Sequence, residues 1–335
     1  MIEWIHPGLL FVFGAAPIPF LRGRWRQAWL IGIPLLAIAA VASMTPGNYG
    51  AFDFAGVELL IGKVDKLSLV FAWVFTIMSL IGSVYALHVK GPEQHVAAYL
   101  YMGSALGVVF AGDWFTLLVS WEIMAFASAY LIFAAGGKAA IAAGFRYLMV
   151  HVTGGVLLFG GIVILGLETG SFLIGPLAGQ GGLAFVLILV AFMINAAVPP
   201  LNAWLTDAYP EATVTGAVFL SAFTTKTAVY VLIRTFPGTE ALVWLGAMMA
   251  IYGVVYAVLE NDCRRLLAYH IISQVGYMVV GVGIGTEMAL NGTSSHAFAH
   301  IIYKGLLFMG AGAVIHMTGR HRSEEHTSEL QSHLN

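Results

Sequence analysis

Long apolar runs separated by short polar links dominate the chain. Eleven of these runs are long enough to cross about 30 Å of hydrocarbon, which takes about 20 helical residues. They cover residues 5–21, 27–44, 67–88, 95–112, 114–134, 139–167, 182–206, 212–236, 241–259, 266–285 and 291–317. The pattern predicts an all-α, polytopic membrane bundle of about eleven helices. The short links leave no room for a soluble domain.

Composition supports the same class. Hydrophobic residues make up 59% of the chain and charged residues 10%, against roughly 25% charged residues in a soluble domain. The net charge of −2 comes with no basic face, which excludes a nucleic-acid-binding module. Cys263 is the single cysteine, so the sequence carries neither a disulfide framework nor a thiolate set for an iron–sulfur cluster. We expect no cofactor.

Lysine and arginine are distributed unevenly between alternate links. One set of links carries Arg22, Arg24, Arg26, Lys90, Lys138, Arg264, Arg265 and Arg320, and the other carries Lys63, Lys66 and Arg234. Positive residues accumulate on the cytoplasmic side, so the first set predicts the cytoplasmic face of a plasma membrane and an N-terminus outside. With Glu3 as the only formal charge before the first run, no cleaved signal peptide is expected. The longest outside link, residues 45–66, has a partly alternating stretch that favours a small β-hairpin.

A few ionisable residues lie inside the apolar runs, and they are the candidates for function. A charge at the centre of a spanning helix costs roughly 2.5 to 3.5 kcal/mol on insertion scales, so each must be paired, hydrated or used. Glu122 lies near the middle of the run 114–134, where neighbouring groups decide whether its carboxyl is charged or neutral. Lys226 lies mid-run between threonines whose hydroxyls suit a water chain, and it is too far from either end to snorkel easily. The alternative for both is a structural ion pair.

His296, His300 and Lys304 follow one another at i, i+4 and i+8. This spacing places them along one face of a helix over about 12 Å. Histidine titrates near neutral pH, so two histidines leading to a lysine are typical of a proton relay. Core histidines bonded to helix backbone are the alternative. A metal site is disfavoured because no acidic or thiol third ligand accompanies the pair.

Two prolines interrupt the run 182–206, in Asn195-Ala-Ala-Val-Pro-Pro-Leu201. Pro199 and Pro200 have no N–H to donate to the carbonyls of Asn195 and Ala196, so a discontinuous helix is expected. Transporters use such breaks to line ion pathways. A kink with a packing role is the alternative.

Arg146 and His151 lie in the first half of the run 139–167. We assign them, with Asn195, Pro199 and Pro200, to the flanks of the predicted pathway, because one or both can reach the same polar interior. For Arg146, an anchor at the cytoplasmic interface is the alternative.

In this order, these residues resemble the antiporter-like subunits shared by respiratory complex I, membrane-bound hydrogenases and the multisubunit Mrp cation/proton antiporters. The resemblance covers nearly the whole chain up to residue 321. It rests on Ser120-Trp-Glu122, Pro199-Pro-Leu-Asn-Ala-Trp-Leu-Thr-Asp-Ala208, Glu211-Ala-Thr-Val-Thr-Gly216, 220–226, Arg265-Leu-Leu-Ala-Tyr269, Ser273-Gln-Val-Gly-Tyr277 and 296–304. The segment 209–231 looks most like the D subunit of Mrp-type Na⁺/H⁺ antiporters.

The resemblance implies about fourteen helices built from two inverted five-helix repeats, each with a broken helix. By this comparison, residues 1–94 form N-terminal helices and the hairpin link, 95–237 form the first repeat, and 238–321 form part of the second. About three further helices of the family would follow residue 320. The family's charged axis maps onto Glu122, Lys226, His300 and Lys304. Asn195 stands where the family usually has a lysine on the broken helix, and its amide cannot hold a transferable proton.

Residues 322–335 form a polar string without an apolar stripe. The string is similar to the translation of a short sequencing adapter, so we expect a non-native tail. A solvated native tail is the alternative. His326 and His333 are therefore excluded from any predicted site.

The sequence thus predicts a transporter subunit rather than an enzyme. It would move protons through a hydrated axis of Glu122, Lys226, His296, His300 and Lys304. A broader hypothesis adds Na⁺ or K⁺ to the transported ions. Its partners would be other membrane subunits and the lipid bilayer. A proton-pumping subunit of a complex I-like dehydrogenase or hydrogenase is one alternative. A scaffold that has lost transport, which Asn195 favours, is another.

Overall fold

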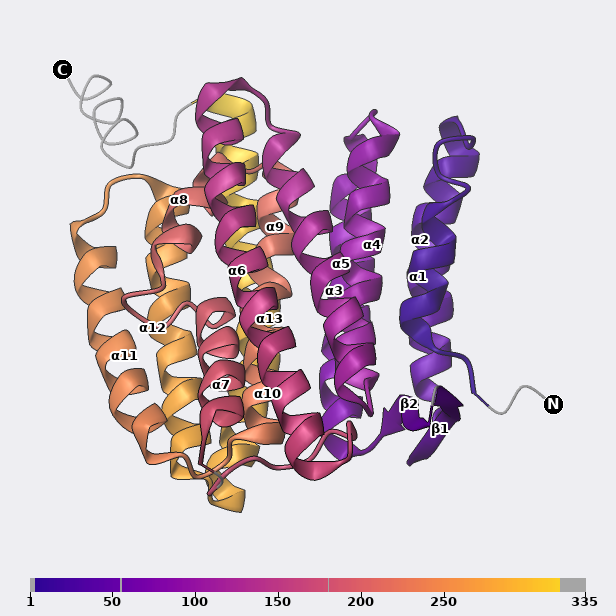
Figure 1. The fold of residues 1–335 in the computed structure, drawn as a ribbon. Coiled ribbons are helices and arrows are strands. Elements are labelled where there is room, and N and C mark those ends of the chain that lie inside the picture. Colours follow the sequence, from indigo (N-terminus) through magenta and orange to yellow (C-terminus); the bar gives the residue numbers. More distant parts are fainter. Residues whose placement is uncertain (1–3, 55, 180, 320–335) are drawn as a thin grey trace.

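A bundle of long helices with nearly parallel axes makes up most of the molecule (Figure 1). The computed structural model describes residues 4–54, 56–179 and 181–319. Its helices are α1 (Pro7–Ala15), α2 (Gly23–Ala42), α3 (Lys66–Tyr85) continued by the 3₁₀ turn η1 (Ala86–His88), α4 (Pro92–Phe110), α5 (Trp114–Phe133), α6 (Gly137–Thr169), α7 (Leu183–Asn195), α8 (Ala203–Glu211), α9 (Val214–Ala222), α10 (Thr224–Thr235), α11 (Glu240–Leu259), α12 (Cys263–Ile284) and α13 (Glu287–Thr318).

Length and composition identify membrane-spanning candidates among these helices. In the described part of the chain, eight spans are long and apolar enough to cross a bilayer, with α9 and α10 counted as one. The apolar helix α7 is shorter, with 13 residues, and α1 has nine. The predicted membrane helix bundle is confirmed, whereas the count of eleven spans stays a prediction.

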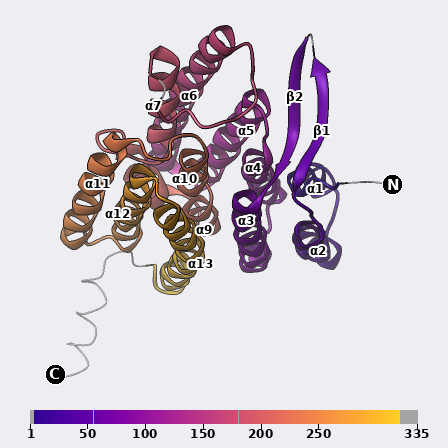
Figure 2. The same ribbon diagram turned by 90° about the horizontal axis from the view of Figure 1, so that it is seen from below.

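The predicted β-hairpin is present at one end of the bundle, where strands β1 (Gly47–Phe54) and β2 (Val57–Val64) pair antiparallel (Figure 2). The Asp113 carboxylate fixes its position. It caps α5 by accepting the Thr116 backbone N–H at 2.8 Å, and it also accepts the Leu60 N–H of β2 at 2.9 Å. One fully buried carboxylate therefore accepts hydrogen bonds from a free N–H group at the start of α5 and from an N–H group of β2.

Glycines allow α11 and α12 to pack with their backbones almost in contact. A Cβ on Gly253 would lie 2.4 Å from the Ser273 nitrogen, and one on Gly276 would lie 2.6 Å from the Ala250 nitrogen. Such close approach by small residues is a common means of helix association in membranes. The two helices therefore pack as a tightly fitted pair.

The loop between α8 and α9 joins this pair to the rest of the bundle. The Arg264 guanidinium at the start of α12 donates to the Ala212 carbonyl at 2.9 Å. The next residue, Thr213, donates its backbone N–H to the Leu131 carbonyl of α5 at 3.2 Å. This loop is thus held by α12 on one side and α5 on the other.

Candidate functional site

The predicted break near Pro199 is present. Helix α7 ends at Asn195, and α8 begins at Ala203 after a turn in which Ala197 has a positive φ of 58°. The indole N–H of Trp204 donates to the Ile194 carbonyl at 2.9 Å, so a side chain from the second half replaces a lost helical bond of the first. A cavity of about 340 Å³ lined by Pro200, Ile194 and Trp204 adjoins the break. A protein side chain therefore provides a hydrogen bond to a backbone carbonyl at the break, which lipid hydrocarbon could not do.

A second interruption occurs where the sequence analysis expected one continuous run, 212–236. Helix α9 ends at Ala222 and α10 starts at Thr224, with Phe223 between them at φ −102° and ψ −62°. Neither proline nor glycine marks this point, and the polar string 224–227 is the only local signal. The Lys226 ammonium donates to the Ser221 carbonyl across the break, at 2.5 Å.

Lys226 is completely buried, as are His300 and Lys304 on α13. The Lys304 ammonium donates to the Leu267 carbonyl of α12 at 3.2 Å. Lys226 and Lys304 both lie within electrostatic range of the His300 ring. Two lysines and a histidine from two helices therefore gather in one buried region, and none of the three forms an ion pair in the described part of the chain.

The two histidines of the predicted ladder lie side by side on α13. The rings of His296 and His300 are 6.1 Å apart and inclined by 17°, and Tyr303 packs edge-on against His300 at 5.0 Å. Both His300 ring nitrogens and the His296 Nε2 are buried without a hydrogen-bond partner from the protein. The nitrogens are therefore available to exchange protons or to bind water. They do not bond to helix backbone, as the alternative interpretation required.

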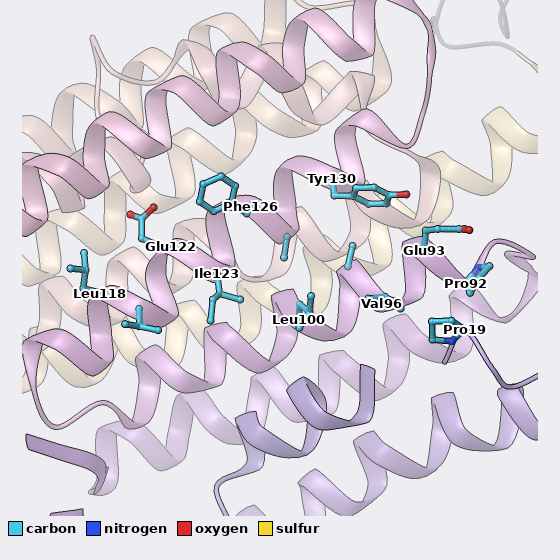
Figure 3. A pocket seen from close by; sticks show the side chains of 13 residues that line it. Pro19, Pro92, Glu93, Val96, Leu100, Leu118, Glu122, Ile123, Phe126 and Tyr130 are labelled. Carbon is cyan, nitrogen blue, oxygen red and sulfur yellow. The ribbon is translucent and has the colours of Figure 1, made fainter. Parts of the chain in front are cut away.

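Glu122 occupies a different position, on the flank of α5 that faces α6. Its Oε1 is buried without a hydrogen-bond partner, and a Cβ added to Gly155 would lie 1.7 Å from this oxygen. Glu122 also lines a cavity of about 900 Å³ between α4 and α5. Figure 3 shows Glu122 towards one end of this cavity and Glu93 towards the other. In the described part of the chain, Glu122 forms no ion pair with Lys226. The alternative prediction of a static ion pair between them is therefore wrong.

The remaining predicted residues divide between interior and surface. His151 is buried, with Nδ1 at 2.9 Å from the Tyr147 carbonyl and its ring edge-on to Trp204 at 4.5 Å. Asn195 is buried with both amide atoms unpartnered. Arg146 instead points outward and forms a two-bond ion pair with Asp207 of α8, at 2.6 and 2.8 Å. It therefore does not reach the polar interior.

Sequence reasoning missed several polar groups of this interior. His270 on α12 lies within electrostatic range of His300 and Lys304, and its Nδ1 is buried without a partner. The hydroxyls of Tyr101 and Tyr147 meet near Thr224. A tyrosine or histidine within an apolar run was the available signal. In the described residues, no three histidine, cysteine or acidic side chains gather as metal ligands.

A known protein family matches the part of the chain that holds this site. The family model described as NADH:quinone oxidoreductase/Mrp antiporter, TM, matches residues 111–334. The chain belongs to this family. The matched part begins just before α5 and therefore includes Glu122, both helix breaks and the buried groups of α10 and α13.

Individual relatives agree with the family assignment. The NADH-quinone oxidoreductase subunit N of Desulforudis audaxviator is 30% identical over 91% of this chain and 67% of its own length. The Na⁺/H⁺ antiporter D subunit of Alkalihalophilus pseudofirmus is 34% identical over 66% of this chain, which spans 48% of that relative. The structure of the membrane-bound sulfane sulfur reductase, an archaeal respiratory membrane complex, matches with a TM-score of 0.86 and 26% identity, over 96% of this chain and 58% of that chain. The antiporter-like fold is thereby confirmed.

Proposed function

We propose that the chain is an ion-translocating subunit of a multisubunit cation/proton antiporter. Protons, exchanged against Na⁺ or K⁺, would move along an axis of Glu122, Lys226, His296, His300 and Lys304. The observation that carries the proposal is the burial of Lys226, His300 and Lys304 together without an acidic partner among the described residues. Unpaired ionisable groups at membrane depth are expensive to hold and mark ion pathways in proteins that retain them.

The physical mechanism is electrostatic rather than covalent. Two unit charges about 8 Å apart interact by about 2 kcal/mol at an effective dielectric constant near 20. Loading a proton at one group therefore changes the proton affinity of the next by more than tenfold. Within this axis, Lys226 and Lys304 each act on His300, which makes the histidine the group that responds to both.

The position of the chain in the cell belongs to the same proposal. The loops that join α1 to α2, α3 to α4 and α5 to α6 lie at the end of the bundle opposite the hairpin (Figure 1). The arginine and lysine of these loops support a cytoplasmic location for that end. We propose a plasma-membrane protein with its N-terminus and hairpin outside, assembled with other membrane subunits.

A second candidate is the proton-pumping membrane subunit of a respiratory oxidoreductase. The similarity to subunit N of an NADH-quinone oxidoreductase supports it. The two candidates share the buried axis and differ in what drives it. Flux driven by a cation gradient alone favours the antiporter, whereas flux that requires electron transfer favours the oxidoreductase.

The test uses Glu122→Gln and Lys226→Ala in the protein within its native membrane complex. Both variants should lower proton and Na⁺ flux in sealed vesicles, because each removes a proton-carrying group. Glu93→Gln is the matched control, since Glu93 lines the same cavity at its other end. Unchanged flux in both Glu122→Gln and Lys226→Ala would end the proposal.

A further inference from the structure

A buried histidine of α6 faces the break between α7 and α8. The His151 ring is edge-on to the Trp204 indole at 4.5 Å, and that indole donates to the Ile194 carbonyl, directly before Asn195. One turn further along the same face of α6, a Cβ added to Gly154 would lie 3.8 Å from the Asn195 Oδ1. The His151 ring and the Asn195 amide therefore border the same region between α6 and the break.

The hydrogen bonding of His151 defines which of its nitrogens can exchange a proton. Nδ1 lies 2.9 Å from the Tyr147 carbonyl, and a carbonyl can only accept, so Nδ1 carries a proton. Nε2 is buried and has no hydrogen-bond partner among the described residues. In the neutral ring Nε2 is an acceptor, and after protonation it is a donor. Nε2 is therefore the atom that can take up and release a proton, and it needs a partner suited to both states.

The Asn195 side chain can serve both states. It is fully buried, and neither its Oδ1 nor its Nδ2 has a hydrogen-bond partner among the described residues. The Nδ2 group can donate to a neutral Nε2 of His151. After a turn of the amide, Oδ1 can accept from the protonated Nε2, directly or through one water. The Asn202 Nδ2, beside the same break, is also buried without a partner, so an ordered water would have several polar groups to bond here.

The charged groups around His151 lie on other helices than α7. Helices α5, α7 and α8 pack on α6, and α7 carries no titratable side chain. The titratable side chains of the others and of α6 itself are Glu122, Tyr130, Lys138, Arg146, Tyr147, Glu168, Asp207, Tyr209 and Glu211. Arg146 and Asp207 pair with each other at the surface, and Glu122 lies against Gly155, one turn beyond His151. A charge introduced at position 195 would therefore act on His151 from a helix that holds no other charge.

We propose that His151 is a further proton-carrying group of transport, loaded at Nε2, and that Asn195 is the partner that changes from donor to acceptor as the ring becomes charged. The proton comes from water at the break and returns to water. The C-terminal end of α7 supports the charged ring, because free carbonyls at a helix end favour a cation. This proposal rests on the proposed function, since it adds a site to the proton pathway proposed above.

The test is the pH profile of proton flux in vesicles that hold the native complex. His151→Gln, whose amide can still donate to the Tyr147 carbonyl, should remove the part of the profile that titrates with His151. Asn195→Asp places a negative charge beside the ring and should move that part to higher pH. Asn195→Lys places a positive charge there and should move it to lower pH. A neighbouring charge at short range shifts a titration by about one pH unit or more.

Two controls isolate the effect on His151. Neither Asn195 substitution should shift the profile when combined with His151→Gln. Asn48→Asp adds the same charge to the exposed hairpin and should leave the profile unchanged. Asn195→Asp keeps the shape of the side chain, so it decides the test alone if Asn195→Lys does not assemble. An unchanged profile in His151→Gln or in Asn195→Asp, or shifts of the same sign in both Asn195 variants, would overturn the proposal. The proposed function fails separately, through unchanged flux in Glu122→Gln and Lys226→Ala.

Discussion

Gly155→Ala tests whether the position of the Glu122 carboxylate matters for transport. The added Cβ would lie 1.7 Å from the Glu122 Oε1, whereas ordinary contact begins at 3.4 Å, so the oxygen must move by about 1.7 Å. Proton transfer requires heavy atoms within about 2.6 to 3.2 Å, and a displacement of this size disrupts such contact. A misplacement of about 1 Å in a reacting group can lower a rate by about a hundredfold, so proton flux should fall by at least about tenfold.

The same substitution should leave the fold intact. Alanine gains roughly 1 kcal/mol of helix stability over glycine, and turning the end of a flexible side chain costs about the same amount. The thermal unfolding midpoint in detergent should therefore change little, while vesicle flux falls.

Gly154→Ala provides the matched control. Its Cβ would meet Ile194, Ala191 and Asn195 atoms at 3.6 to 3.8 Å, which is ordinary contact. The helix-propensity gain is the same, and the Glu122 carboxylate is not displaced, so flux should stay at the original level. Equal flux in Gly155→Ala and Gly154→Ala would refute the reasoning, because the position of Glu122 would then have no effect.

Two further predictions concern Asp65 and Asn195. Burial raises the pKa of Asp65, but hydrogen bonds from Arg234 outweigh this and hold the pKa below its ordinary value of 3.8. The stabilisation is therefore present at neutral pH and is lost as the pH falls below about 4. Asp65→Asn should lower stability by about 1 to 3 kcal/mol at pH 7, and the difference in unfolding midpoint should shrink in acid; an equal difference at both pH values would contradict this. Asn195→Lys should give no gain in proton flux, because the proposed axis through Lys226, His300 and Lys304 carries the protons without a charge at position 195. Increased flux in vesicles would show instead that this chain is a degenerate channel.

Features with local signals could be predicted from the sequence. Long apolar runs gave the helices, an alternating link gave the hairpin, and paired prolines gave the break between α7 and α8. The i, i+4 spacing placed His296 and His300 side by side, because helix geometry alone fixes that relation.

Features that depend on packing between distant segments could not be predicted. The break at Phe223 has no proline or glycine, and its carbonyls are satisfied by side chains such as Tyr209, which donates to the Leu220 carbonyl at 2.8 Å. The outward direction of Arg146 depends on Asp207, which is 61 residues away in sequence. The contact of Glu122 with Gly155 depends on how α5 packs on α6. None of these relations leaves a periodic trace in the sequence.

The loop between α8 and α9 has a mechanical consequence. Arg264 donates to the Ala212 carbonyl, and Thr213 donates to the Leu131 carbonyl of α5. This loop therefore connects α12 to α5. A tilt of α12 would pull on α8, whose other end adjoins the proline break. We expect such a tilt to reach the chain near Asn195 and Trp204 both through the Arg264 hydrogen bond and through the direct packing of α12 on α8.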